Sequence, residues 1–332
     1  MTTWANLSMK PFKAPTHTTI GDKVAISFSG GKSSAYMTKM VLDWIRGNRP
    51  DIQVSVTFAN TGQEHPETLR FIDQCDREFG FGVVWLEALV NPERGKGISF
   101  TRKSFETASR NGEPFEAYIQ KHGIPNKMYP QCTSRLKTEV MDAYHKSIGW
   151  KVGSYNFCVG IRADEIHRAS GKSMDIGAIY PLVDAGVTKD DVRNWWATQP
   201  FNLNIPEHLG NCVWCWKKSF RKLLTIGRDH PSAFEFPARM EAQYATCGGK
   251  RRDGQDRQAR TFFRGNKSTQ DILAMAQQPF EPFVDDKFIP YDEQMDEHGS
   301  CGDSCEVGVD RNDLYDPEEL DLFDERVIAR IN

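Results

Sequence analysis

The chain has 332 residues, of which 39% are hydrophobic and 26% are charged, a composition typical of a globular protein. Its formal net charge of −3 excludes a strong overall attraction to nucleic acid, so such binding would need a local basic patch. The longest apolar runs are shorter than the roughly 18 residues that a membrane span requires, and the polar N-terminus lacks a secretory apolar region. We therefore expect a cytoplasmic protein with no membrane partner.

Strands and helices alternate through the first part of the chain. Short apolar runs indicate buried strands, and apolar residues at helical spacing indicate the helices between them. Gly80 is expected to end the second helix, and Thr188 with Asp191 to cap a later one. The alternation predicts a parallel sheet of the doubly wound α/β class. In chain order, the expected elements are a strand at 23–28, a helix at 33–46, a strand at 52–62, a helix at 65–80, strands at 82–89 and 155–165, and a helix at 188–199.

The composition changes after about residue 205. Residues 247–268 hold seven Lys or Arg and two Asp, whereas residues 281–325 hold seventeen Asp or Glu and two Lys or Arg. We predict an α/β nucleotide-binding domain over 1–205 and a less regular extension over 206–332. The acidic tail would either compete for the basic segment or keep the end of the chain in solution.

A glycine-rich loop, "SFSGGKSS" at 27–34, lies between the first strand and the first helix. Glycines there let backbone N–H groups approach phosphate oxygens, and the helix N-terminus adds partial positive charge. The loop is not a Walker A motif, because Ile26 stands where that motif has its first glycine. A tight turn capped by serines is the alternative to phosphate binding. The expected phosphate ligands are Ser29, Gly30, Gly31, Lys32, Ser33 and Ser34.

Eight cysteines without an export signal favour metal or redox chemistry over disulfides. Cys212 and Cys215 have C-x-x-C spacing, which alone leaves a redox dithiol, a zinc half-site and an iron–sulfur half-site open. Cys75 and Cys158 are expected to be small buried side chains, and the role of Cys247 stays open.

Four ordered stretches carry a resemblance to a known family: "SFSGGKSSAYM" at 27–37, "FANTGQEHPETLRF" at 58–71, "CTSRLKTE" at 132–139 and "GIRADE" at 160–165. The first resembles the PP-loop of the ATP pyrophosphatase-like (adenine nucleotide α-hydrolase-like) superfamily, and the other three resemble, in the same order, the second nucleotide motif, the cysteine-basic motif and the third nucleotide-facing loop of one of its branches. The branch that they resemble most is the phosphoadenosine phosphosulfate (PAPS) reductase-like proteins, often carried by bacteriophages.

The resemblance implies a nucleotide over the carboxyl edge of the sheet, with Thr61, Gly62 and Glu64 lining the crevice. Gly160 and Arg162 would close it. Ser33 departs from the Asp of many relatives, so the family's handling of phosphate and Mg²⁺ does not carry over at that position.

Resemblance to iron–sulfur sulfonucleotide reductases also implies a cluster held by Cys132, Cys212 and Cys215. Gln131 replaces the first cysteine of the tandem pair found in those reductases. Three thiolates can hold a [4Fe–4S] cluster with one iron left free, or Cys305, in preference to Cys301, can supply a fourth. A structural zinc is the alternative.

Two further basic segments are ambiguous. Arg135 and Lys137 follow Cys132 and would either neutralise a phosphate or sulfate group or form a solvated helix face. The segment 250–267 combines arginines with Phe262 and Phe263, which suits either a bound nucleic acid or a basic surface over two core rings.

The leading hypothesis is ATP-dependent sulfur transfer: ATP with Mg²⁺ adenylylates a nucleotide or nucleic-acid acceptor, which is then thiolated. Lys32, Cys132 and Lys137 are the expected catalytic residues. Direct PAPS reduction is weaker, because the Glu-Cys-Gly motif of true reductases is missing from the sequence. Reduction of a sulfonucleotide and a non-enzymatic iron–sulfur nucleotide-binding protein remain alternatives, and the oligomeric state, a homo-oligomer included, stays open.

Overall fold

The computed structural model describes residues 8–93, 95–248, 259–285, 287 and 289–296. None of the helices in these ranges is both long and apolar enough to cross a membrane. The strands are β1 (Lys23–Ser27), β2 (Gln53–Asn60), β3 (Val83–Val90), β4 (Ile98–Lys103), β5 (Asn156–Cys158) and β6 (Ala178–Ile179). The α-helices are α1 (Lys32–Asn48), α2 (Pro66–Phe79), α3 (Glu113–His122), α4 (Glu139–Ser147), α5 (Gly171–Asp175), α6 (Pro181–Asp184), α7 (Lys189–Ala197), α8 (Phe220–Asp229), α9 (Glu235–Tyr244), α10 (Thr269–Ala276) and α11 (Glu293–Asp296).

The described strands form one six-stranded sheet in the order β4-β3-β2-β1-β5-β6. All neighbouring pairs are parallel except β3 and β4. This arrangement confirms the predicted α/β class, although β4 makes the sheet mixed rather than purely parallel. The sequence did not predict β4, whose half-exposed residues form an edge strand without a continuous apolar run.

The chain leaves the central strand β1 in two directions. It first passes through α1 to β2 and then to β3, which lie on one side of β1. The later strands β5 and β6 lie on the other side of β1. The strand order therefore reverses between β1 and β5. In open α/β sheets such a topological switch point opens a crevice at the carboxyl ends of the strands, where ligands bind.

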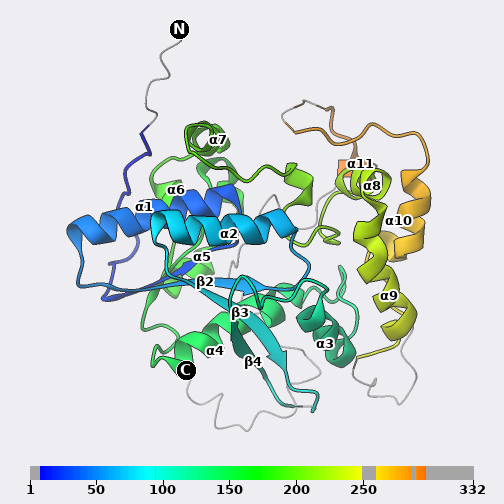
Figure 1. The fold of residues 1–332 in the computed structure, drawn as a ribbon, viewed down its shortest axis with the longest axis horizontal. Coiled ribbons are helices and arrows are strands. Elements are labelled where there is room, and N and C mark those ends of the chain that lie inside the picture. Colours follow the sequence, from blue (N-terminus) through cyan, green and yellow to red (C-terminus); the bar gives the residue numbers. More distant parts are fainter. Residues whose placement is uncertain (1–7, 94, 249–258, 286, 288, 297–332) are drawn as a thin grey trace.

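Helices cover both faces of the sheet (Figure 1). α1, α2 and α7 share one apolar cluster with β1, in which Ile26, Met37 and Trp196 are fully buried. On the other face, α4 packs against β3 and β4, and α3 packs against β3. The core therefore lies in two layers around the sheet, and the carboxyl edge of β1 lies between them.

Helix ends follow local signals in the sequence. Gly80 takes a left-handed conformation after α2, and Thr188 and Asp191 form a capping box at α7, both as predicted. α1 begins at Lys32, one residue earlier than expected, so the lysine of the glycine loop belongs to the first helical turn.

The C-terminal helices share an apolar cluster with the sheet. Leu223 of α8 and Phe234 belong to the same cluster as Leu86 of β3. Phe262 and Phe263 also lie there, with 0% and 2% of their surfaces exposed, so the interpretation of these rings as a platform for a base is wrong. Both rings are core residues. The domain boundary at residue 205 stays a prediction.

His145 on α4 gives the fold a pH dependence. Burial lowers the pKa of His145 to about 4, and its Nε2 lies 3.0 Å from Ser55 Oγ. In the unfolded chain this histidine binds a proton near pH 6.5, whereas in the folded protein it does so only near pH 4. The free energy of unfolding therefore falls as the pH is lowered from about 6.5 to about 4, by about 3 kcal/mol in total. We expect His145→Gln, which can keep a contact to Ser55, to lose less stability over this range. Urea unfolding of both proteins at pH 7 and pH 4.5 measures the difference, and equal losses would contradict the assignment.

Candidate functional site

The glycine loop is held closed by its own hydroxyl groups. Ser29 Oγ donates to Ser34 Oγ at 2.9 Å, and Ser34 Oγ donates to the Gly31 carbonyl at 3.0 Å. The first turn of α1 has no acidic residue and, among the described side chains, no capping hydrogen bond. The first N–H groups of a 17-residue helix therefore face this loop, an arrangement that suits an anion.

Gly30 and Gly31 differ in how tightly they are packed. Gly30 has a φ of 81°, and an added Cβ would lie 2.7 Å from Ile72 Cδ1 and 2.8 Å from Thr68 Cγ2 of α2. For Gly31, which has a φ of −88°, the nearest atom to an added Cβ would be Ser29 Oγ at 3.8 Å. We expect Gly30→Ala to lower the free energy of unfolding by about 1–3 kcal/mol and Gly31→Ala to change it by much less. Urea denaturation compares them, and equal effects would contradict the packing of the loop on α2.

Arg162, in the stretch 160–165, contacts the glycine loop. Its Nη1 donates to Ser33 Oγ at 3.2 Å, while Asp164 and Glu165 hold the guanidinium at 3.1 Å and 3.3 Å. Gly160 is buried two residues earlier. From α7, Trp196 Nε1 donates to the Lys32 carbonyl at 3.0 Å. The structure thus brings Ser33 and Arg162, 129 positions apart, to one place.

The segment after β2 lies beside the cysteines. The Glu64 carboxylate accepts hydrogen bonds from the Thr61 N–H and hydroxyl, each at 2.9 Å, and lies 3.8 Å from Lys137 Nζ. The backbone of Glu64 also pairs with that of Cys212. Gly62, with a φ of 76°, packs against the backbone of Gly112. Thr61 and Glu64 are thus tied to the C-x-x-C loop, and the same segment continues into α2, against which Gly30 packs.

Three cysteines line one pocket. In this pocket, which we call the thiol pocket, the space outside the protein atoms amounts to about 370 Å³ and includes open solvent. Burial raises the pKa of the Cys212 thiol, and the nearby Glu64 raises it further, whereas Lys137 acts in the opposite direction. Thr61 Oγ1 lies 3.4 Å from Cys212 Sγ. The lining residues include Thr61, Cys132, Lys137, Cys212, Cys215 and Lys217.

The donor set of the thiol pocket fits a soft metal centre, because thiolates bind zinc and iron–sulfur clusters. Within the part of the chain that the structure describes, however, no three His, Cys, Asp or Glu side chains form a group that could hold a metal ion as they stand. Cys301 and Cys305 lie outside the described residues. The number of protein ligands therefore stays a prediction.

Arg135 and Lys137 lie on a short π-helix, η1 (Ser134–Thr138), between Cys132 and α4. Both residues are only 7% exposed, so the alternative of a solvated helix face is wrong. Arg135 Nη1 pairs with Glu139 at 2.9 Å. π-Helical turns are uncommon and often occur at functional sites. Here the turn carries Lys137 into the thiol pocket.

Residues that the sequence analysis did not single out fix the C-x-x-C loop. Lys218 Nζ donates to the carbonyls of Gly210, Cys212 and Val213 at 2.8, 2.9 and 2.8 Å. Trp214 Nε1 donates to Gln63 Oε1 at 2.5 Å. Gln63 lies within a recognised motif and Lys218 lies three residues after Cys215. Only the folded chain shows that Lys218 donates to the carbonyls of this loop and that Gln63 bridges two motifs.

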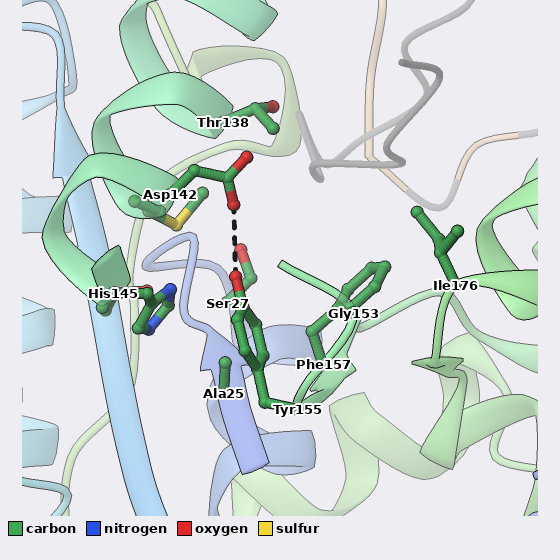
Figure 2. A pocket seen from close by; sticks show the side chains of 11 residues that line it. Ala25, Ser27, Thr138, Asp142, His145, Gly153, Tyr155, Phe157 and Ile176 are labelled. Atoms are coloured by element: carbon green, nitrogen blue, oxygen red, sulfur yellow. Dashed lines mark hydrogen bonds between the residues drawn. The ribbon is translucent and has the colours of Figure 1, made fainter. Parts of the chain in front are cut away.

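A second pocket lies at the switch point, between β1, β5 and α4 (Figure 2). It holds about 500 Å³ of space outside the protein atoms. The sequence analysis missed it, because its lining residues are spread over five segments of the chain and only Ser27 and Thr138 belong to a recognised motif. We call it the switch-point pocket. It is lined by Ala25, Ser27, Thr57, Thr138, Met141, Asp142, His145, Gly153, Tyr155, Phe157 and Ile176.

Cys75, Cys158, Cys247 and the described part of the basic segment line neither of these pockets. Cys75 and Cys158 are buried as predicted, and burial raises the pKa of Cys158 to about 12. Cys247 is half-buried and does not line the thiol pocket. Of the segment 250–267, residues 250–258 lie outside the described residues. Arg260 is buried over the Tyr129 ring, and Arg264 is buried and donates to the Lys218 carbonyl at 3.1 Å.

Known proteins share this sequence pattern. The family model described as the phosphoadenosine phosphosulfate reductase domain matches residues 23–176. The nin region protein ORF290 of Escherichia phage lambda is 32% identical over 287 residues, which cover 85% of this chain and 94% of the phage protein. The chain belongs to the PAPS reductase-like family. This confirms the phage-type resemblance and supports a nucleotide-related function for the PAPS reductase-like protein.

A more distant relative shares only part of the chain. The protein MJ0973 of Methanocaldococcus jannaschii is 28% identical over 120 residues, which cover 36% of this chain and 22% of the archaeal protein. The shared region is thus a limited part of a longer protein, and this match adds nothing to the expected activity of the PAPS reductase-like protein.

Proposed function

We propose that this PAPS reductase-like protein binds an adenylyl nucleotide at the glycine loop and catalyses ATP-dependent sulfur transfer to a nucleotide or nucleic-acid acceptor. The observation that carries the proposal is the thiol pocket, which Cys132, Cys212 and Cys215 all line although Cys132 precedes Cys212 by 80 positions. Thr61 and Glu64 tie this pocket to the segment that leads into α2, and α2 packs against Gly30.

The glycine loop supports the first step, which is adenylyl transfer. An oxygen of the acceptor attacks the α-phosphorus of ATP, the α–β phosphoanhydride bond breaks, and pyrophosphate leaves with Mg²⁺. Lys32 and the first N–H groups of α1 are placed to stabilise the charge that develops on the leaving pyrophosphate. Arg162, held beside Ser33, adds guanidinium N–H groups to the same site.

The thiol pocket supports the second step, which is sulfur transfer. Hydrosulfide attacks the activated carbon, the carbon–oxygen bond breaks, and AMP leaves, so that this exchange needs no oxidant or reductant. Lys137 and Lys217 would balance the negative charge of hydrosulfide and of the leaving AMP. Cys132, Cys212 and Cys215 would hold a [4Fe–4S] cluster, which when bound offers one iron without a protein ligand for sulfur.

A second candidate is the thiol-dependent reduction of a sulfonucleotide. The two lysines beside three thiols favour it, because a sulfate group of a bound nucleotide would meet positive charge and sulfur ligands in one pocket. Under this function the nucleotide is bound but not made, and a dithiol reductant supplies two electrons as sulfite and the nucleoside phosphate are released.

Product analysis separates the two functions. The anaerobically purified protein is incubated with Mg²⁺, ATP, sulfide and fractions of nucleotides and RNA, and separately with PAPS and a reduced dithiol protein. Pyrophosphate release that depends on the acceptor supports sulfur transfer, whereas sulfite release supports reduction. If neither pyrophosphate nor sulfite is released and the protein does not bind ATP, both functions are contradicted.

A further inference from the structure

Trp216 has a hydrogen-bond donor that no protein atom uses. Its side chain lines the thiol pocket and is only 4% exposed. Within the described ranges, its indole Nε1 is buried and has no hydrogen-bond partner. Buried tryptophan N–H groups usually find a partner, because a buried donor without one costs about 1–3 kcal/mol. A group that binds in the thiol pocket can supply that partner.

The neighbouring Trp214 shows the opposite case. It also lines the thiol pocket and is 1% exposed, but its Nε1 donates to Gln63 Oε1. The two rings are thus equally buried and lie two positions apart on one loop. Trp214 therefore ties the loop to the segment after β2, whereas the N–H of Trp216 can serve a ligand.

The loop that carries Trp216 is held by its own hydrogen bonds. The Cys215 N–H donates to the Cys212 carbonyl at 3.0 Å, and the Lys218 N–H donates to the Cys215 carbonyl at 3.0 Å. The Lys218 ammonium binds three further carbonyls, those of residues 210, 212 and 213. Trp216 follows Cys215 directly, so its indole is fixed relative to two of the three thiols. A donor fixed in this way loses little freedom when a ligand binds.

The polar groups around Trp216 suit an anion. Lys217 Nζ lies 5.5 Å from the centroid of the Trp216 ring and 3.4 Å from Thr133 Oγ1. Lys137 also lines the thiol pocket, and Glu64, which lies 3.8 Å from its Nζ, is not a lining residue. The described residues that line this pocket include no Asp or Glu. Donors and positive charge beside three cysteines favour a negatively charged sulfur atom.

We infer that the indole N–H of Trp216 donates a hydrogen bond to an anionic sulfur atom in the thiol pocket. Two sources offer this chemistry: a sulfur of the iron–sulfur centre, and hydrosulfide that enters as the sulfur donor. A hydrogen bond to a sulfur of the centre stabilises its reduced form and so raises its reduction potential. A hydrogen bond to hydrosulfide tightens its binding. The inference deepens the proposed function and rests on it.

The test replaces Trp216 with β-(3-benzothienyl)alanine, which keeps the size of the ring system but has sulfur in place of the N–H. Trp216→Phe is a second variant without the donor. Anaerobic redox titration gives the midpoint potential, and titration with sodium sulfide, followed by visible absorption, gives the dissociation constant. We expect both variants to show a more negative potential or about 10-fold weaker sulfide binding. A change in potential places the donor on the centre, and a change in sulfide affinity places it on hydrosulfide.

Trp85→Phe is the matched control, because it also shortens a buried tryptophan but Trp85 packs in the apolar cluster of α1 and α2 and does not line the thiol pocket. It should leave the potential and the sulfide affinity unchanged. Iron and sulfide per chain are measured in every variant. Their loss from Trp216→Phe alone reflects lost packing, so the benzothienylalanine variant then decides.

Two results would count against the inference, and they differ in what they say of the proposed function. If the wild type holds the iron–sulfur centre and the benzothienylalanine variant has the same potential and the same sulfide affinity, the role of Trp216 is overturned and the proposed function stands. If the wild type holds neither iron nor acid-labile sulfide, the proposed function fails and the role of Trp216 fails with it.

Discussion

Replacing Cys212 with alanine is expected to remove the iron and acid-labile sulfide of the anaerobically purified protein. Cys212 is partly buried and lines the thiol pocket with Cys132 and Cys215, and Thr61 and Glu64 contact it from the neighbouring segment. A cluster held by only two of these three thiolates should not survive purification, since structural metal centres depend on their full ligand set. The measurement is iron and sulfide per chain, together with the visible absorption spectrum.

Cys75→Ala is the matched control for this experiment. It also removes one thiol, but Cys75 lies in the apolar cluster of α1 and α2 and does not line the pocket. We expect this variant to keep the iron and sulfide of the wild type. Zinc without sulfide in the wild-type protein would contradict an iron–sulfur centre and identify a structural metal site instead.

Replacing Lys32 with alanine is expected to reduce ATP-dependent pyrophosphate release by about 10²–10³-fold. Preorganised charges on a transferring phosphoryl group contribute effects of this size, and Lys32 stands at the first turn of α1 beside the closed serine loop. The variant should also bind ATP more weakly. Steady-state pyrophosphate release and nucleotide dialysis measure the two effects.

Lys39→Ala tests whether any lysine of α1 would have the same effect. Lys39 lies on the same helix but pairs with Asp43 at 2.7 Å on the outer surface. Its loss should leave pyrophosphate release and ATP binding within about twofold of the wild type, because exposed ion pairs contribute little. Equal losses in both variants would contradict a specific role for Lys32.

The sequence predicted the parts of the site that short motifs encode. The glycine loop, the C-x-x-C pair and the capped helix α7 depend on neighbouring residues, so their local geometry could be read from the chain. The alternation of strands and helices likewise predicted the parallel centre of the sheet. β4 escaped detection, because an edge strand with half-exposed residues has no clear periodic pattern.

Residues that meet only after folding could not be predicted. Asp142 on α4 and Tyr155 in the loop before β5 lie 13 positions apart, and nothing in their spacing indicates that they share a pocket. The burial of Phe262 and Phe263 depends on their packing with distant segments of the chain, so the sequence left two interpretations open. The position of Arg135 and Lys137 depends on the π-helix, so their surroundings could not be predicted from the sequence.

The central claim is that the nucleotide loop and the thiol pocket serve one reaction. It is tested most directly by titrating ATP into the anaerobically purified protein while its visible absorption is recorded. Because the segment from Thr61 to Glu64 joins Cys212 to the helix beneath Gly30, we expect ATP to change the thiolate–iron absorption. The change should saturate with ATP binding and be lost in Lys32→Ala. A spectrum that stays constant while ATP binds to saturation would contradict a shared site.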